Sequence, residues 1–158
     1  MRNPLKIGLL MAIMAVFSVV ETVPADDMHR PNPSISAAEV VAIQLDALMR
    51  NDSPDADDGI RQTWAFAHPD NRKVTGPLGR FIEMMKTPAY EPLLNHRRHT
   101  ITEQNRAREW VQFKVLMEDR GGRVLAFAWV VKKVKSGEYK DCWMTSAVSA
   151  PVLAGQGS

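Results

Sequence analysis

The densest group of side chains able to do chemistry is the run His96-Arg97-Arg98-His99, with Arg106 and Arg108 further along the chain. A guanidinium group binds a carboxylate or phosphate through two parallel N–H donors, so Arg97 and Arg98 indicate a site for an anionic ligand or an acidic partner protein. The alternative is a solvated strand edge, on which these basic side chains pair with Glu103 and Glu109. No aromatic side chains are interleaved with the arginines, which argues against nucleic-acid binding.

The histidines and the cysteine offer little further chemistry. His96 and His99 are three residues apart on an expected strand, where they point to opposite faces, so no metal site is predicted. His68 precedes Pro69 in an expected turn, where a local hydrogen bond is the ordinary role. Cys142 is the only cysteine, and without a nearby base it is expected to be a small buried hydrophobe. No cofactor is predicted.

Three helices are expected in the first part of the chain. Ser36 and Glu39 form a capping box that begins a helix over residues 37–50. A second helix is predicted over residues 59–67. A third has Pro77 in its first turn, the helical position that proline tolerates best.

After Pro92 the hydrophobic side chains recur at every second position, which is the period of a strand. Strands are expected over residues 96–103, 109–118, 123–135 and 139–148. Helices segregated from an antiparallel sheet define the α+β class. The expected architecture is three N-terminal helices packed on a curved antiparallel sheet of about four strands.

The turns decide which side chains share a face of this sheet. A two-residue turn at Gly121-Gly122 places a pocket under the helices, lined by Trp64, Phe81, Tyr90, Phe113, Ala126, Ala128, Val130, Trp143 and Thr145. The alternative is that helix side chains fill this space. The other face would then be apolar and uncovered, which predicts a homodimer packed through Leu116, Phe127, Trp129, Val131 and Met144. A turn of odd length would reverse half of this assignment.

The N-terminus has the layout of a secretory signal peptide, expected over residues 1–25. Arg2 and Lys6 precede the uncharged apolar residues 7–20, and Val23-Pro24-Ala25 suits a cleavage site. The apolar run is shorter than the roughly 20 residues of a spanning helix, so cleavage after Ala25 and an exported, periplasmic or secreted product without stable membrane insertion are expected. The alternative is that the segment is retained as an anchor. The remaining predicted parts are a flexible lead-in (26–35), a single domain (36–148) and a disordered tail (149–158).

Composition restricts the class of protein. Hydrophobic residues make up 45% of the chain and charged residues 24%, and the formal net charge is +2. These values are typical of a globular domain, and they exclude a disordered chain and a strongly basic nucleic-acid binder.

Five segments together resemble one known family: Ile43-Gln44-Leu45, Trp64-Ala65-Phe66-Ala67-His68-Pro69, Thr75-Gly76-Pro77-Leu78-Gly79-Arg80-Phe81, Pro88-Ala89-Tyr90-Glu91-Pro92-Leu93-Leu94 and Cys142-Trp143-Met144-Thr145. Over about residues 36–148 the chain resembles the family called domain of unknown function 4864, which is similar to the nuclear transport factor 2-like (cystatin-like) superfamily. The resemblance implies a cone-shaped fold in which a curved sheet wraps around a helix. It brings no established activity.

The same superfamily includes ketosteroid-isomerase-like enzymes, whose chemistry needs a carboxylate base in an apolar cavity. Acids are scarce near the expected pocket, and Asp141 suits a surface ion pair with Lys132. The expected function is therefore a non-catalytic module that binds a small apolar or amphipathic ligand, or a partner protein. The alternatives are an enzyme that uses the same cavity and a purely structural docking domain. An open cavity favours ligand binding, a filled one favours docking, and a buried acid favours the enzyme.

Overall fold

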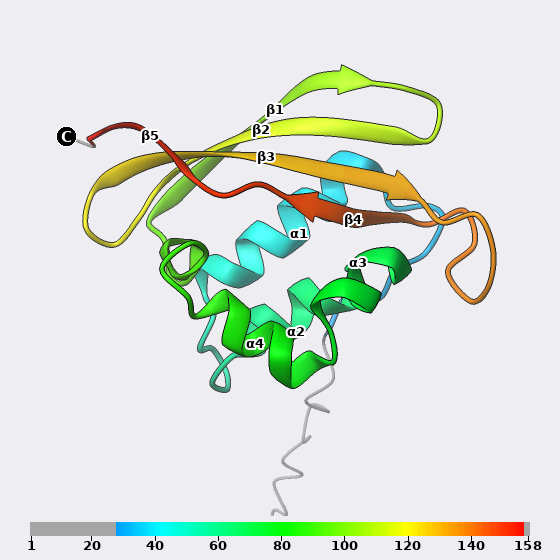
Figure 1. Ribbon diagram of the computed structural model, residues 1–158, viewed down its shortest axis with the longest axis horizontal. Coiled ribbons are helices and arrows are strands. Elements are labelled where there is room, and N and C mark those ends of the chain that lie inside the picture. Colours follow the sequence, from blue (N-terminus) through cyan, green and yellow to red (C-terminus); the bar gives the residue numbers. More distant parts are fainter. Residues whose placement is uncertain (1–27, 157–158) are drawn as a thin grey trace, which may run out of the picture.

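A computed structural model describes residues 28–156 (Figure 1). Its elements, in chain order, are α1 (Ala37–Met49), α2 (Asp58–Ala65), α3 (Pro69–Thr75), α4 (Leu78–Met85), the 3-10 helix η1 (Glu91–Leu93), β1 (Arg98–Arg106), β2 (Trp110–Glu118), β3 (Arg123–Lys133), β4 (Trp143–Val148) and β5 (Val152–Gln156). The predicted α+β class and antiparallel sheet are confirmed. The expected signal peptide lies outside the described residues.

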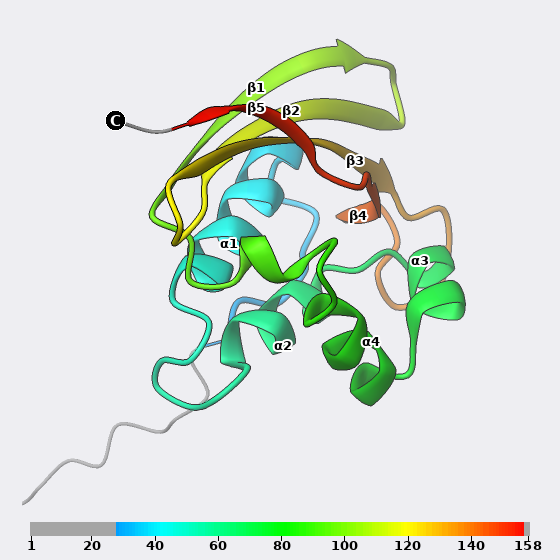
Figure 2. The same ribbon diagram turned by 60° about the vertical axis from the view of Figure 1, so that its left-hand side comes forward.

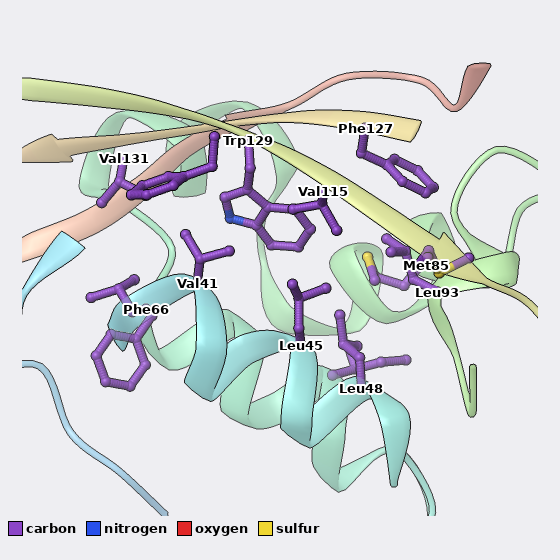
Figure 3. Close-up of a cluster of buried hydrophobic side chains, with 14 of the residues drawn as sticks. Val41, Leu45, Leu48, Phe66, Met85, Leu93, Val115, Phe127, Trp129 and Val131 are labelled. Atoms are coloured by element: carbon purple, nitrogen blue, oxygen red, sulfur yellow. The ribbon is translucent and has the colours of Figure 1, made fainter. Parts of the chain in front are cut away.

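Helix α1 begins where the capping box predicts. The Oγ of Ser36 accepts the backbone N–H of Glu39 at 3.3 Å, and the Glu39 carboxylate accepts the N–H of Ser36 at 2.8 Å. Both groups would otherwise be unsatisfied at a helix start. Along the helix, Val41, Leu45 and Leu48 are fully buried and point toward the sheet (Figure 3).

The helical layer contains one more helix than expected. His68 is the N-cap of α3, because its Nδ1 accepts the N–H of Asp70 at 3.1 Å. Pro69 occupies the first turn, where an N–H is not needed. The sequence predicts that the second helix ends at this proline. It does not predict that another helix, α3, begins there. Within residues 28–156, four α-helices rather than three precede the sheet.

All five strands belong to one antiparallel sheet, in the order β1-β2-β3-β4, and β5 pairs with the part of β3 that β4 leaves free. The four α-helices lie on one side of this sheet, and the other side carries no helix (Figures 1 and 2).

Because β5 covers Val152–Gln156, the expectation of a disordered tail is wrong there. From His29 on, the lead-in is bound to α2, since the N–H and C=O of His29 pair with the amide of Gln62 at 2.7 and 2.9 Å.

The turn between β2 and β3 is longer by one residue than expected. Asp119 and Arg123 are the last pair, with the Asp119 N–H donating to the Arg123 C=O at 2.9 Å. Three residues lie between them, and Gly122 ends the loop at φ 85°, which is the usual form of a three-residue hairpin. Phe113 therefore pairs with Trp129. The predicted register is wrong, because a slip of one residue moves the side chains of β3 to opposite faces.

This corrected register places the large side chains of β3 in the core. Phe127, Trp129 and Val131, which were expected at a dimer interface, are at most 1% exposed and belong to the same core cluster as the buried side chains of α1 (Figure 3). Ala126 and Ala128 point to the uncovered side instead. Burying aromatic rings removes more apolar surface from water than burying alanine does, so this register is the more stable one.

In the described chain, no helix is both long and apolar enough to cross a membrane.

Candidate functional site

A cavity of about 600 Å³ lies between the helices and the β4 edge of the sheet. This volume falls within the roughly 300–1,000 Å³ range of small-molecule sites. Helices α3 and α4 lie beside this edge (Figures 1 and 2). Most of the wall is apolar, and its larger apolar side chains are Phe81, Met84, Met85, Leu93, Trp129 and Val148.

The cavity exists because the α2–α3 connection attaches to the edge of the sheet. Thr145 donates its N–H to the C=O of Phe66 at 2.8 Å, and its C=O accepts the N–H of His68 at 2.8 Å. Ala67 thus forms a parallel bridge with Thr145. This connection keeps α3 and α4 against β4, so the cavity has a wall on its helical side.

Three buried polar side chains form the inner wall of the cavity and bond to one another. The Trp129 Nε1–H donates to Thr145 Oγ1 at 3.0 Å and to Gln44 Oε1 at 3.2 Å. The Thr145 hydroxyl donates to Gln44 Oε1 at 2.5 Å, and Gln44 Nε2 donates to the C=O of Thr63 at 2.9 Å. Buried polar groups that are satisfied in this way do not require a ligand. The inner wall therefore presents mainly apolar surface to an occupant.

At the mouth, the titratable groups are poorly suited to base catalysis. Asp70 is the only carboxylate among the described residues that line the cavity. Its side chain is 74% exposed, and the hydrogen bond from Lys73 at 2.9 Å lowers the pKa of Asp70. His68 is buried, and burial lowers its pKa. A general base needs a raised carboxyl pKa or an unprotonated imidazole nitrogen facing the substrate. The Nδ1 of His68 accepts the N–H of Asp70 as a helix cap, which leaves the ring proton on Nε2.

The structure separates the residues predicted to line the pocket. Phe81, Tyr90, Val130 and Thr145 do line the cavity. Phe113 is in the core, Trp64 and Trp143 pack beside the core, and Ala126 and Ala128 lie on the uncovered face of the sheet. The prediction therefore found only part of the wall.

Gln44 and Trp129 were missed as cavity residues. Gln44 interrupts the apolar stripe of α1, lying three residues after Val41 and four before Leu48. A polar side chain inside a buried stripe needs a hydrogen-bond partner. The position of Gln44 within the stripe could therefore have indicated an internal polar site. Trp129 is on the wrong face in the predicted register, and its large side-chain volume beside Ala128 is the signal that could have placed it in the core.

The predicted anion site is occupied by a carboxylate of the protein itself. Arg98 Nε donates to Glu118 at 2.7 Å, and Arg97 Nη1 donates to the same carboxylate at 3.1 Å. The Glu118 side chain is only 7% exposed. Burial opposes ionisation of Glu118, but the hydrogen bonds and charges of the two arginines leave its pKa lowered. Arg97 and Arg98 therefore stabilise the β1–β2 pair. Of the alternative partners, Glu103 does pair with a basic side chain of the predicted group, Arg106, at 2.7 Å, whereas Glu109 pairs with Lys135.

His96 and His99 lie side by side, contrary to the expectation for a regular strand. β1 begins only at Arg98, so the alternation does not extend to His96. His96 Nδ1 donates to the C=O of Leu93 at 2.7 Å, because a carbonyl oxygen can only accept. His99 Nδ1 then donates to His96 Nε2 at 2.8 Å, and His99 Nε2 lies 3.6 Å from Asp46. Among the described residues, no group of three or more His, Cys, Asp or Glu side chains could hold a metal ion.

We expect the free energy of unfolding to fall as the pH drops through about 6.5, the ordinary pKa of histidine. Burial lowers the pKa of His96, His99 and His68 in the folded protein. The unfolded chain therefore takes up protons first, and each of these histidines destabilises the fold by at most about 1.4 kcal/mol per pH unit. Urea unfolding at neutral pH and at about pH 5 measures the slope. His96→Gln should reduce this slope, so an unchanged slope in that variant would contradict the prediction.

The remaining predicted residues also have definite places. Met144 is fully buried and packs with Val134 and Cys142 in a second, smaller cluster. Leu116 is half-buried on the uncovered face of the sheet. Burial raises the pKa of the Cys142 thiol, which makes it a poor nucleophile.

The fold and the site together define an α+β protein with an apolar cavity at the edge of its sheet. Comparisons of the chain with protein-family models, with curated proteins and with solved structures found no match. What the cavity does must therefore be argued from its own chemistry.

Proposed function

We propose that this protein is a non-catalytic module that binds a small apolar or amphipathic ligand in the cavity. One observation carries the proposal: the cavity is open and mostly apolar, and its buried polar groups Gln44, Trp129 and Thr145 already pair with one another. An apolar occupant would remove both its own surface and that of the wall from water, at about 25 cal/mol per Å². It would leave no hydrogen bond of the wall broken.

The two alternatives have less support. An isomerase-type enzyme needs a carboxylate base inside the cavity, and the carboxylate nearest to that description, Asp70, is exposed and paired with Lys73. A purely structural docking domain gains nothing from an open cavity, because unfilled apolar space costs stability. Ligand binding is therefore the function best supported by an open, mostly apolar cavity whose buried polar groups are already paired.

The proposal includes a fold family and a location. The helices packed on one side of a curved antiparallel sheet support a nuclear transport factor 2-like cone, with α1 lying along the covered face (Figure 1). We also propose that the protein acts after export, with residues 1–25 removed. N-terminal sequencing of the protein recovered from its host should then begin at Asp26.

Filling the cavity is expected to weaken ligand binding. Met84 lines the cavity and is half-buried on α4, so Met84→Trp should place an indole where a ligand would lie. Fluorescence titration with Nile red, a neutral apolar dye, should show an affinity at least about tenfold lower, since tenfold corresponds to ~1.4 kcal/mol of lost contacts.

The matched control is Glu83→Trp, which adds the same ring at an exposed position of the same helix. It should keep the wild-type affinity for Nile red. If the wild-type protein binds no dye, or if both variants bind it equally, the cavity is not a ligand site. Thermal unfolding of each variant excludes loss of the fold as the cause.

A further inference from the structure

A second hollow, of about 530 Å³, adjoins the mouth of the cavity. Four lysines line it: Lys73, Lys132, Lys133 and Lys135. Two carboxylates, Asp70 and Glu109, line it as well. We call this second feature the lysine hollow. Its charged side chains carry an excess of positive charge, whereas the lining of the cavity is mostly apolar.

The lysine hollow and the cavity share part of their lining. His68, Asp70 and Lys132 contribute to both. These three residues therefore form the boundary between an apolar compartment and a basic one. An extended molecule that lay in the cavity with one end at the mouth would bring that end to Lys132.

The positive charge of the lysine hollow is only partly compensated. Lys73 Nζ pairs with Asp70 at 2.9 Å, and Lys135 Nζ pairs with Glu109 at 3.2 Å. Lys133 Nζ lies 5.2 Å from the centre of the Trp143 ring, which attracts the ammonium group without neutralising it. Within the described residues, no carboxylate lies within ion-pair distance of Lys132, and its side chain is exposed.

We infer that the ligand is a single-chain amphipathic anion, with its apolar chain in the cavity and its carboxylate or phosphate group at Lys132. This inference rests on the proposed function and adds the chemical class of the ligand. An ammonium group on a flexible stem can meet an anionic head group in several positions, so both head groups fit. The apolar wall of the cavity selects for the apolar chain of the ligand. Lys132 selects for a negatively charged head group, and Lys133 adds a second positive charge nearby.

The test compares laurate, dodecyl phosphate and dodecanol, which have the same chain and differ in the head group. Displacement of Nile red measures each affinity at low ionic strength. The wild-type protein should bind the two anions about fivefold more tightly than dodecanol, as expected for an exposed ion pair. Lys132→Gln should remove this difference and leave the affinity for dodecanol unchanged. Lys114→Gln, on an exposed lysine of β2 outside both hollows, is the matched control.

The outcomes distinguish failure of this inference from failure of the proposed ligand-binding function. If none of the three compounds binds, the proposed function is overturned. If dodecanol binds as tightly as both anions, the ligand is apolar and only the present inference fails. If Lys132→Gln keeps the difference, the head group does not lie at Lys132, and the inference fails in that form. A preference that disappears in Lys132→Gln but persists in Lys114→Gln supports it. Added salt should then weaken the binding of the anions but not of dodecanol.

Discussion

Replacing Gly59 with alanine is expected to lower the free energy of unfolding by about 3 kcal/mol, the upper end of the usual range for overpacking. A Cβ at this position would lie 2.3 Å from the carbonyl oxygen of Ala47 and 2.8 Å from the Cα of Asn51. All of these neighbours are backbone atoms of α1 and the residues that follow it, so no side chain can rotate away. Helices α1 and α2 would have to move apart.

Gly79→Ala is the matched control, because it makes the same change in another helix. A Cβ at Gly79 would meet nothing within 4 Å. Alanine has the higher helix propensity, so this variant should be more stable than the wild type by about 0.5–1 kcal/mol. Urea unfolding measures both changes. Effects of the same sign at Gly59 and Gly79 would show that α1 and α2 are not in the contact described here.

The close approach at Gly59 also serves the cavity. The C=O of Gly59 accepts the hydroxyl of Thr63 at 2.8 Å, and the C=O of Thr63 accepts the amide of Gln44 at 2.9 Å. The distance between α1 and α2 thus determines where Gln44 Oε1 meets Thr145 and Trp129. A variant that separates these helices should disturb the inner wall of the cavity as well as the stability.

Local signals in the sequence predicted much of the secondary structure. The capping box of Ser36 and Glu39 gave the start of α1, since both of its hydrogen bonds form within four residues of chain. The alternating pattern gave β2 over Trp110–Glu118, with its odd-numbered side chains buried. Each of these features depends on neighbours in the chain, which is why a single sequence suffices to find them.

Features that depend on one residue of turn length were not predicted. The two glycines at 121 and 122 suggested a two-residue turn, whereas Asp119 accepts the N–H of Arg123 at 2.9 Å through its side chain and closes a three-residue loop. This difference alone reversed the faces of β3, and with them the expected pocket and dimer interface. Side-chain volume would have indicated the correct register, because Phe127 and Trp129 fill a core better than Ala126 and Ala128.

The wall of the cavity depends on contacts between distant parts of the chain. Gln44 and Thr145 bond across 101 positions, and the bridge between Ala67 and Thr145 joins a helical connection to a strand edge. No periodicity encodes such pairs. The sequence could indicate that apolar surface exists, but only the tertiary arrangement shows where it remains open.

Replacing Trp129 with alanine is expected to lower the free energy of unfolding by about 4 kcal/mol, within the range for removing a buried aromatic ring. Trp129 is 1% exposed, packs against α1 and also lines the cavity (Figure 3). Its loss should therefore enlarge the cavity as well as weaken the core. This is a large part of the total stability of about 5–15 kcal/mol for a domain, and urea unfolding measures it.

Trp129→Phe separates packing from hydrogen bonding at the same position. Phenylalanine keeps an aromatic ring at the position but loses the N–H and part of the indole volume, while Gln44 Oε1 still accepts the Thr145 hydroxyl, so the cost should be about 1–2 kcal/mol, well below that of alanine. If Trp129→Ala folds, Nile red should recover part of its stability, because a ligand that binds only the folded state stabilises it. Equal costs for the two variants would mean that the hydrogen bond, and not the ring, holds the inner wall together.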